Sequence, residues 1–234
     1  MIDTTIDRRG LLAAGTLLGA AGAAAASAQT APAPSAVGFP VRPLPFDPKS
    51  IPGLSEKLLV SHHDNNYAGA VKRLGAIRAD IAALDPAKAP TYELNGLKRE
   101  ELIAWNSMIL HEIYFAGLSA QPSQPGLTLA QALERDFGSV DRWRSEFSSM
   151  GKALGGGSGW VVLTFSPHDG KLVNQWAADH TMALAGATPL LVLDMFEHAF
   201  HLDYGAKAGT YVDAVMKALN WSNADTAFAH ATRA

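Results

Sequence analysis

A change in hydrophobic period partway along the chain restricts its fold more than any other feature of the sequence. Up to residue 154, apolar residues recur at the three- and four-residue spacing of amphipathic helices. The glycines at 155–157 interrupt this pattern, and the segments after them are short and rich in the valine, leucine and aromatic residues that strands favour. Helices followed by a group of strands predict an α+β fold.

The first half is predicted to form two long helices. One covers residues 54–84 and ends before Pro86, and the other runs from about 97 to 118, after Pro90. Two successive helices with a short connection form a helical hairpin. We therefore predict a helical hairpin domain over residues 46–122.

The second half, residues 126–234, is predicted to be an α+β domain. Gly138 ends one short helix and Ser139 can cap the next. The dipeptide Asp169-Gly170 is a strong hairpin turn signal. It separates the first two strands of a predicted three-stranded antiparallel sheet, whose strands are 160–165, 171–176 and 189–193. A last helix is predicted around residues 211–219.

The N-terminus has the pattern of a targeting segment. Arg8-Arg9 precedes a weakly apolar Ala/Gly/Leu run that ends in Ala26-Ser27-Ala28, so residues 1–28 resemble a twin-arginine export signal. The alternative, an uncleaved membrane anchor, is less favoured because the run is short and broken by glycines. We expect an exported, periplasmic protein without a stable membrane span, in which residues 29–45, rich in Pro and Ala, form a tether.

Composition excludes several classes of function. The chain has no cysteine, which rules out disulfides, thiolate metal sites and cysteine catalysis. Its formal net charge of -3 offers no sign of a nucleic-acid partner, which usually meets a basic face. Any metal must therefore be bound by His, Asp, Glu or water.

Four residues could form such a site. Asp194 and His198 are four positions apart and can face one point, while His62 and His111 lie on the two predicted long helices. Three imidazoles and one carboxylate suit iron, manganese or zinc. A lone histidine on a helix is more often structural than a ligand, so spacing alone leaves both interpretations open.

Several ordered segments resemble one known family. Residues 194–200 read Asp-Met-Phe-Glu-His-Ala-Phe and look like the D-x-W-E-H-[AS]-[FY] signature of iron/manganese superoxide dismutases. Four further similarities follow the family order and extend the resemblance over residues 44–221: Leu44-Pro45-Phe46, Gly157-Ser158-Gly159-Trp160, residues 187–191, and Asn220-Trp221.

The resemblance implies an enzyme that converts superoxide to oxygen and hydrogen peroxide by redox cycling of one iron or manganese ion per chain, usually as a homodimer. The implied ligands are His62, His111, Asp194 and His198. A metal-binding relative with little dismutase activity, or a peroxidase at the same metal, is the alternative. A zinc hydrolase is disfavoured because its usual helix motif is missing from the sequence.

The resemblance also implies roles beside the ligands. His180 is predicted to tune the metal-bound solvent where the family often has glutamine, with Ser107 leaving room for it; the alternative is a surface histidine in a loop. Trp160 is predicted to form part of the pocket wall. Phe115 and Phe196 stand where the family usually has tryptophans.

The first helix departs from the family pattern H-x-x-x-H-H-x-x-Y. With His62 as the ligand, Asn66 replaces a histidine and Ala70 replaces a tyrosine; a rival register aligns Tyr67 with that tyrosine but puts Leu59, which cannot bind a metal, at the ligand position. In a dimer, Glu197 would reach the partner's His198. Asn66 and His201 would pair across the same interface.

Overall fold

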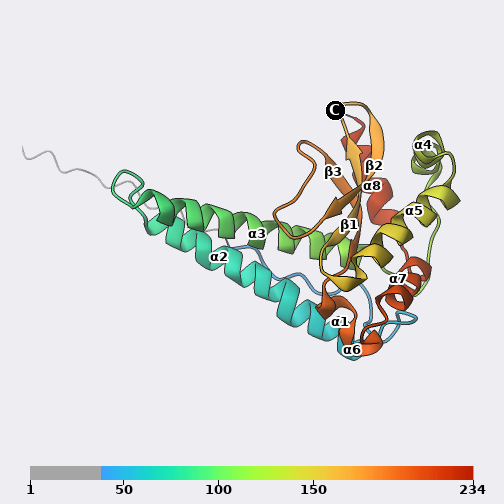
Figure 1. Ribbon diagram of the computed structural model, residues 1–234, viewed down its shortest axis with the longest axis horizontal. Coiled ribbons are helices and arrows are strands. Elements are labelled where there is room, and N and C mark those ends of the chain that lie inside the picture. Colours follow the sequence, from blue (N-terminus) through green and yellow to red (C-terminus); the bar gives the residue numbers. More distant parts are fainter. Residues whose placement is uncertain (1–37, 234) are drawn as a thin grey trace, which may run out of the picture. The chain divides into compact units, whose positions relative to one another are not determined.

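The computed structural model describes residues 38–233. The predicted export signal, and residues 29–37 of the predicted tether, lie outside this range. In the described part the chain forms a helical region followed by an α+β region with a three-stranded antiparallel sheet, so the predicted fold class is confirmed (Figure 1).

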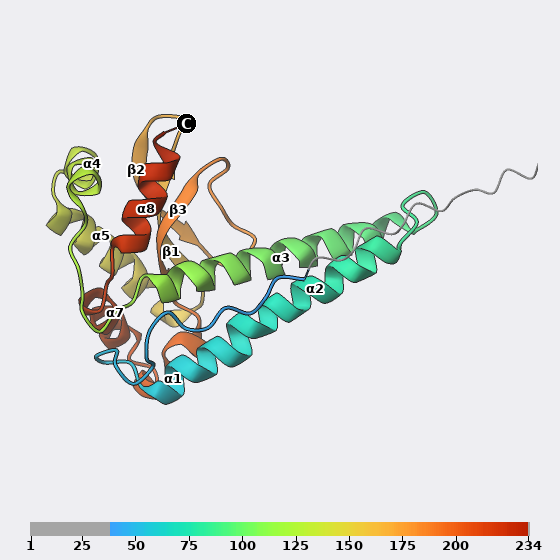
Figure 2. The same ribbon diagram turned by 180° about the vertical axis from the view of Figure 1, so that it is seen from behind.

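The helical region is a long hairpin. Helices α2 (Ala68–Ala83) and α3 (Thr91–Ala116) run side by side along their length in both views (Figures 1 and 2). A short helix α1 (Glu56–Ser61) precedes α2, and the Ser55 hydroxyl caps it by accepting a hydrogen bond from the Leu58 amide at 3.1 Å. Helix α3 begins earlier than predicted because Pro90, which lacks an N–H, occupies the N-cap position and does not break the helix.

The first predicted helix is not one uninterrupted α-helix. Between α1 and α2, the segment η1 (His62–Tyr67) is π-helical, and the Ala68 amide donates to the His63 carbonyl five residues back. A π turn holds an extra residue and changes the direction in which the following side chains point, and such turns are frequent at functional sites. Here the π turn begins at one of the predicted ligands.

The sheet has the order β2-β1-β3, with both pairs antiparallel. Its strands are β1 (Trp160–Ser166), β2 (Lys171–Ala177) and β3 (Thr188–Asp194). Strand β1 is buried from Trp160 to Phe165, as expected of a central strand that is covered on both faces. The register places Trp160 opposite Asp194.

Helices cover the sheet. Helices α4 (Leu127–Phe137) and α5 (Val140–Ala153) contact β2, α5 also contacts β1, and α8 (Ser222–Ala231) packs against β3. Helix α8 was not predicted, because its apolar pattern consists mainly of alanines. The remaining elements are η2 (Leu154–Gly156), η3 (Glu197–Ala199), α6 (His201–Tyr204) and α7 (Ala208–Lys217).

The hairpin and the C-terminal helices are joined by backbone hydrogen bonds. The Asn220 amide donates to the Gly117 carbonyl at 2.8 Å, and the Ser119 amide donates to the Ala218 carbonyl at 2.9 Å. These bonds fix the end of α3 beside the segment between α7 and α8. Within residues 38–233, each helix is too short or too polar to cross a bilayer.

Position 159, immediately before β1, requires glycine because the backbone of Ala177 passes too close to it for a side chain. The φ of Gly159 is +140°, and a Cβ there would overlap the Ala177 carbonyl oxygen; its own carbonyl accepts a hydrogen bond from the Met195 amide at 2.9 Å. We expect Gly159→Ala to lower the free energy of unfolding by about 2–4 kcal/mol, because a strained φ and a backbone clash act together. Chemical denaturation measures the change. Gly156→Ala is the control, because a Cβ there meets no atom within 4 Å, and equal stability of the two variants would contradict the expectation.

Candidate metal centre

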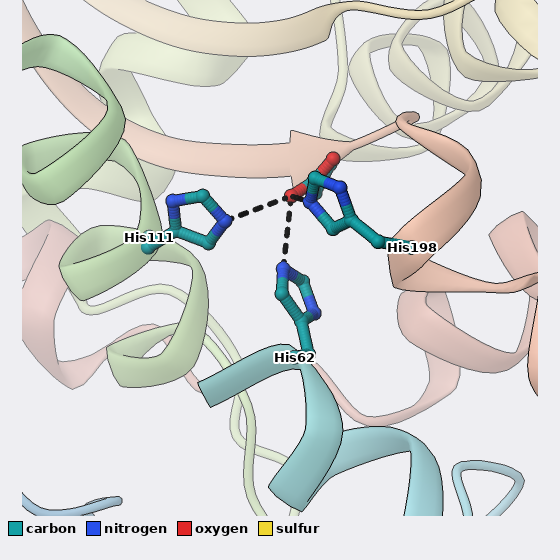
Figure 3. Close-up of side chains that lie close together, drawn as sticks. His62, His111 and His198 are labelled. Carbon is teal, nitrogen blue, oxygen red and sulfur yellow. Dashed lines mark hydrogen bonds and ion pairs between the residues drawn. The ribbon is translucent and has the colours of Figure 1, made fainter. Parts of the chain in front are cut away.

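Four side chains from four different elements converge on one point. His62 begins η1, His111 lies on α3, Asp194 ends β3 and His198 lies in η3. One donor atom from each lies within 4.8 Å of the others. The Nε2 atoms of His62, His198 and His111 are 3.1, 3.2 and 3.6 Å from Asp194 Oδ2. Figure 3 shows the three imidazoles pointing toward this common position.

The centre is almost completely removed from water. His62 and His111 are each 1% exposed and Asp194 is 0% exposed, whereas the His198 side chain is 25% exposed. Burial by itself favours a protonated Asp194, but the hydrogen bonds and charges of His198 and His62 outweigh it and lower its pKa well below the usual range. The site therefore carries an anionic carboxylate in its centre.

The His111 imidazole is held in the form that binds a cation. The His111 Nδ1–H donates to the Ser107 carbonyl at 2.6 Å, which leaves its Nε2 as a lone pair aimed at the centre. That buried Nε2 has no hydrogen-bond partner among the described residues. Burial lowers the pKa of His111 to about 3, with the neighbouring His62 as the second cause, so the ring is neutral at physiological pH.

This donor set fits one transition-metal ion. Neutral imidazole nitrogens and one carboxylate suit iron, manganese or zinc, and an unpaired buried nitrogen is costly unless something binds it. An anionic carboxylate surrounded by three nitrogen donors would also have its charge compensated by a cation. The structure thus brings together all four residues that the resemblance implies as ligands.

Asp194 and His198 meet across the end of a strand and the turn that follows it. They do not lie on one helical face, because β3 ends at Asp194 and a turn leads into the 3₁₀ segment η3. The Phe196 amide donates to Asp194 Oδ1 at 2.9 Å and fixes the carboxylate within this turn, so that Oδ2 is left for the histidines. The Phe196 ring stacks on His198 with 5.4 Å between centroids.

His180 and Trp160 lie beside the four converging residues. The Trp160 Nε1–H donates to His180 Nδ1 at 2.8 Å, so neutral His180 carries its proton on Nε2. The buried Trp160 ring meets the His111 ring edge-on at 5.2 Å, and the half-buried His180 ring lies 4.8 Å from Phe196. Burial lowers the pKa of His180, which keeps it neutral.

The residues that depart from the family pattern of the first helix gather at a cavity. Asn66, Ala70, Ser107 and His180 line one cavity of about 230 Å³. Tyr67 lies elsewhere, since its hydroxyl donates to Glu112 at 3.0 Å and accepts from the Arg42 amide.

The residues of the rival register lie outside the centre. Leu59 is fully buried in the hydrophobic core, where the rival register would require a ligand. His63 lies next to the site in sequence, but its Nε2 bonds the Arg42 carbonyl at 2.8 Å. Glu197 and His201 are exposed, on η3 and α6.

Sequence reasoning missed three polar residues that hold the site. The Tyr211 hydroxyl donates to the Asp194 carbonyl at 2.8 Å and accepts from the Tyr114 hydroxyl at 3.1 Å. The Asn106 side chain donates to the His180 carbonyl at 2.6 Å. Tyr211 and Tyr114 lie within apolar helical stripes, where a tyrosine reads as core, so the sequence pattern gives no signal of these bonds.

The metal-free protein is expected to lose stability as the pH falls. The pKa of His111 is lowered in the folded state to about 3, so the unfolded chain binds more protons between about pH 6.5 and 3. Stability is fully present above the unfolded pKa and declines across this window, at up to about 1.4 kcal/mol per pH unit. Urea denaturation of the metal-free protein at a series of pH values measures the slope. His111→Gln should make the slope shallower without abolishing it, because burial also lowers the pKa values of His62 and His180. An unchanged slope in that variant would contradict the assignment.

Fold and donor set together define the class: an α+β metalloprotein with a mononuclear centre between a helical hairpin and a small sheet. Comparison with known proteins gives the family. Residues 125–227 match the model of the iron/manganese superoxide dismutases, C-terminal domain. The superoxide dismutase [Fe] of Cupriavidus metallidurans is 62% identical over 195 residues, covering 83% of this chain and 98% of that protein.

Among more distant relatives, some are named for iron and others for manganese. The superoxide dismutase [Fe] of Aquifex pyrophilus is 32% identical over 194 residues, covering 80% of this chain and 90% of that protein. The superoxide dismutase [Mn] 1 of Halobacterium salinarum is 30% identical over 196 residues, covering 82% and 96%. The chain belongs to the iron/manganese superoxide dismutase family.

Proposed function

We propose that this protein is a superoxide dismutase with His62, His111, Asp194 and His198 as the ligands of one metal ion. The observation that carries the proposal is the convergence of these four buried donors on one point, with the His111 Nε2 left unpaired. The 62% identity to a superoxide dismutase [Fe] over most of the chain supports the activity.

The reaction requires one electron to be taken from a superoxide and one to be given to another. Two superoxide anions and two protons give one oxygen and one hydrogen peroxide. When bound, an iron or manganese ion supplies the one-electron couple for both halves. Asp194 contributes a negative charge that favours the higher oxidation state, and hydrogen bonds to Ser107 and Phe196 orient His111 and Asp194.

We assign to His180 the role of the hydrogen-bond donor that supports the protonation step of the reaction. Its Nε2–H is a hydrogen-bond donor toward the cavity that it lines, since its Nδ1 is occupied by Trp160. A donor at this place stabilises an anionic or solvent oxygen beside the ligands. The buried Trp160 fixes the orientation of His180 and excludes water from that side.

Iron is the metal that we propose as native, since the 62% identical relative is named for iron. Relatives at about half that identity are named for either metal, and the donor set accepts both. The test is elemental analysis of the protein as isolated, followed by superoxide decay in pulse radiolysis with the iron-loaded and the manganese-loaded protein.

The outcomes of that experiment separate the candidate functions. Rapid catalytic decay with iron and slow decay with manganese would support both proposals. Full metal occupancy without superoxide turnover would refute the dismutase function and favour the metal-binding alternative. Peroxide-dependent turnover of a reducing substrate in the same sample would favour a peroxidase.

We further propose that the protein is exported and forms a homodimer. The pattern of residues 1–28 supports export, which N-terminal sequencing of protein from cell fractions tests. Exposed Glu197, His201 and Leu202, the last 51% exposed, flank the proposed ligand His198 in the sequence and support a dimer contact there. Sedimentation of wild type and Glu197→Arg tests it, since a reversed charge at a two-fold contact should yield monomers.

A further inference from the structure

His62 is held less directly than His111, the other proposed ligand on the hairpin. The His111 ring is oriented by the hydrogen bond from its Nδ1–H to the Ser107 carbonyl. The corresponding Nδ1 of His62 is buried and has no hydrogen-bond partner among the described residues. A metal-binding histidine usually has its second ring nitrogen fixed by such a bond. The direction of the His62 ring therefore depends on the backbone that carries it and on the side chains packed around it.

The backbone that carries His62 is the π turn η1, in which the Ala68 amide donates to the His63 carbonyl. A single π turn is a rare geometry within an α-helix, so contacts from outside the helix must support it. The Phe115 ring gives part of this support, since its centroid lies 5.1 Å from that of His62 and 6.3 Å from that of Tyr67. Polar contacts give the rest.

The residue at the end of the π turn is bonded to α3. Tyr67 is 1% exposed, and its hydroxyl donates to Glu112 Oε1 at 3.0 Å. Glu112 directly follows the proposed ligand His111 in the sequence. The Tyr67–Glu112 bond thus joins the two elements that carry His62 and His111.

A third segment completes this contact. Residues 38–45, the end of the predicted tether, lie along α2 and α3 in Figure 2, and we call them the strap. Within the strap, the Arg42 amide donates to the Tyr67 hydroxyl at 3.0 Å, and the Arg42 Nη1 lies 3.0 Å from Glu112 Oε2. The Arg42 carbonyl accepts from His63 Nε2 at 2.8 Å. One strap residue therefore binds both ends of the π turn and α3.

The strap is anchored at a second point. The Phe39 ring lies 6.1 Å from the Trp105 ring of α3. The Arg78 guanidinium of α2 lies 5.1 Å from the Phe39 centroid and 4.0 Å from that of Trp105. The prolines of the strap restrict its backbone, which lowers the conformational entropy lost when it docks. These features hold the strap in place beside the π turn.

We propose that the strap, Tyr67 and Glu112 form a clamp that sets the orientation of His62 toward the metal ion. Tyr67 and Glu112 are positioning residues, because they act through the backbone of η1 and not on the metal ion itself. The clamp does for His62 what the Ser107 carbonyl does for His111. This role rests on the ligand set of the proposed function.

Tyr67→Phe is the test variant, because it removes one hydroxyl and keeps the buried ring. We expect a chelator to take iron from the loaded variant about 10-fold faster than from the wild type, since the support of a ligand is lost. The electron paramagnetic resonance spectrum of the bound ferric ion should change, because a turned His62 ring alters the ligand field. In the metal-free variant, the Ala68 amide of the π turn should exchange its hydrogen faster.

Glu101→Gln is the matched control. Glu101 also joins α3 to α2, through Arg78 Nε at 3.3 Å, and its side chain is 13% exposed against 22% for Glu112. The change removes a charge between the helices without touching the π turn, so iron release, the spectrum and the Ala68 exchange should match the wild type. Glu112→Gln should be intermediate, because an amide oxygen can still accept from Tyr67.

The outcomes separate the clamp from the proposed function. Equal iron release and equal spectra in Tyr67→Phe and Glu101→Gln would overturn the clamp, whatever the turnover. A lower melting temperature of Tyr67→Phe with the wild-type spectrum would also overturn it, because Tyr67 would then stabilise only the fold. The expected order of variants in a protein without superoxide turnover would refute the dismutase function and leave the clamp standing.

Discussion

Asp194→Asn is expected to abolish retention of the metal ion and to reduce superoxide turnover further than the roughly 10–100-fold loss typical of residues that only orient a ligand. Asp194 supplies the only negative charge of the centre among the described residues, and its Oδ2 faces all three histidines. Asparagine keeps the size and the Oδ1-type acceptor for the Phe196 amide, but it is neutral. It can no longer balance the charge of a divalent or trivalent cation in this largely buried site.

The measurement separates metal loss from misfolding. Elemental analysis gives the occupancy, and thermal unfolding with and without added iron gives the stabilisation by the metal, which should vanish in the variant. Asp213→Asn is the control, because Asp213 forms an exposed pair with Lys152 at 2.8 Å. Full occupancy and wild-type turnover in Asp194→Asn would refute the assignment of the centre.

His180→Leu should lower turnover by about 10–100-fold while leaving the metal content unchanged. Leucine removes the Nε2–H donor in the cavity and leaves the buried Trp160 Nε1–H without its acceptor at 2.8 Å. The first loss acts on the reaction, and the second costs about 1–3 kcal/mol of stability. His180→Gln should recover much of the turnover, since an amide can both accept from Trp160 and donate into the cavity.

The reduction potential distinguishes a chemical from a structural role of His180. A residue that hydrogen-bonds the solvent or substrate at the metal should shift the potential of the iron-loaded protein when it is removed. His168→Leu, at an exposed position in the turn between β1 and β2, is the control. An unchanged potential and pH profile in His180→Leu, with lower activity explained by lower stability alone, would contradict the proposed role.

The sequence predicted the fold class and named as candidate ligands the four residues whose donor atoms the structure brings together. Local patterns sufficed for this: Gly138 and Ser139 mark a helix end and the next helix start, and Asp169-Gly170 marks a hairpin turn. The ordered motifs around residues 194–200 did the same for Asp194 and His198. Turn chemistry and hydrophobic period are properties of a few consecutive residues, which is why they can be read without coordinates.

Helix boundaries and irregular turns could not be predicted in the same way. The π turn at His62–Tyr67 lies within a helical stripe, and helix α8 has a weak apolar pattern. Both depend on packing against distant segments, which overrides local propensity.

The sequence by itself thus determined the fold class, the long helices, the three strands and which residues could bind a metal. Only the tertiary structure decided that the His111 Nε2 is unpaired, that Trp160 sets the tautomer of His180, and that Tyr67 bonds Glu112. The physical reason is separation along the chain. These contacts join η1, α3, β1 and the loop after β2, and a side chain's burial, tautomer and partner are set by whatever the fold places beside it.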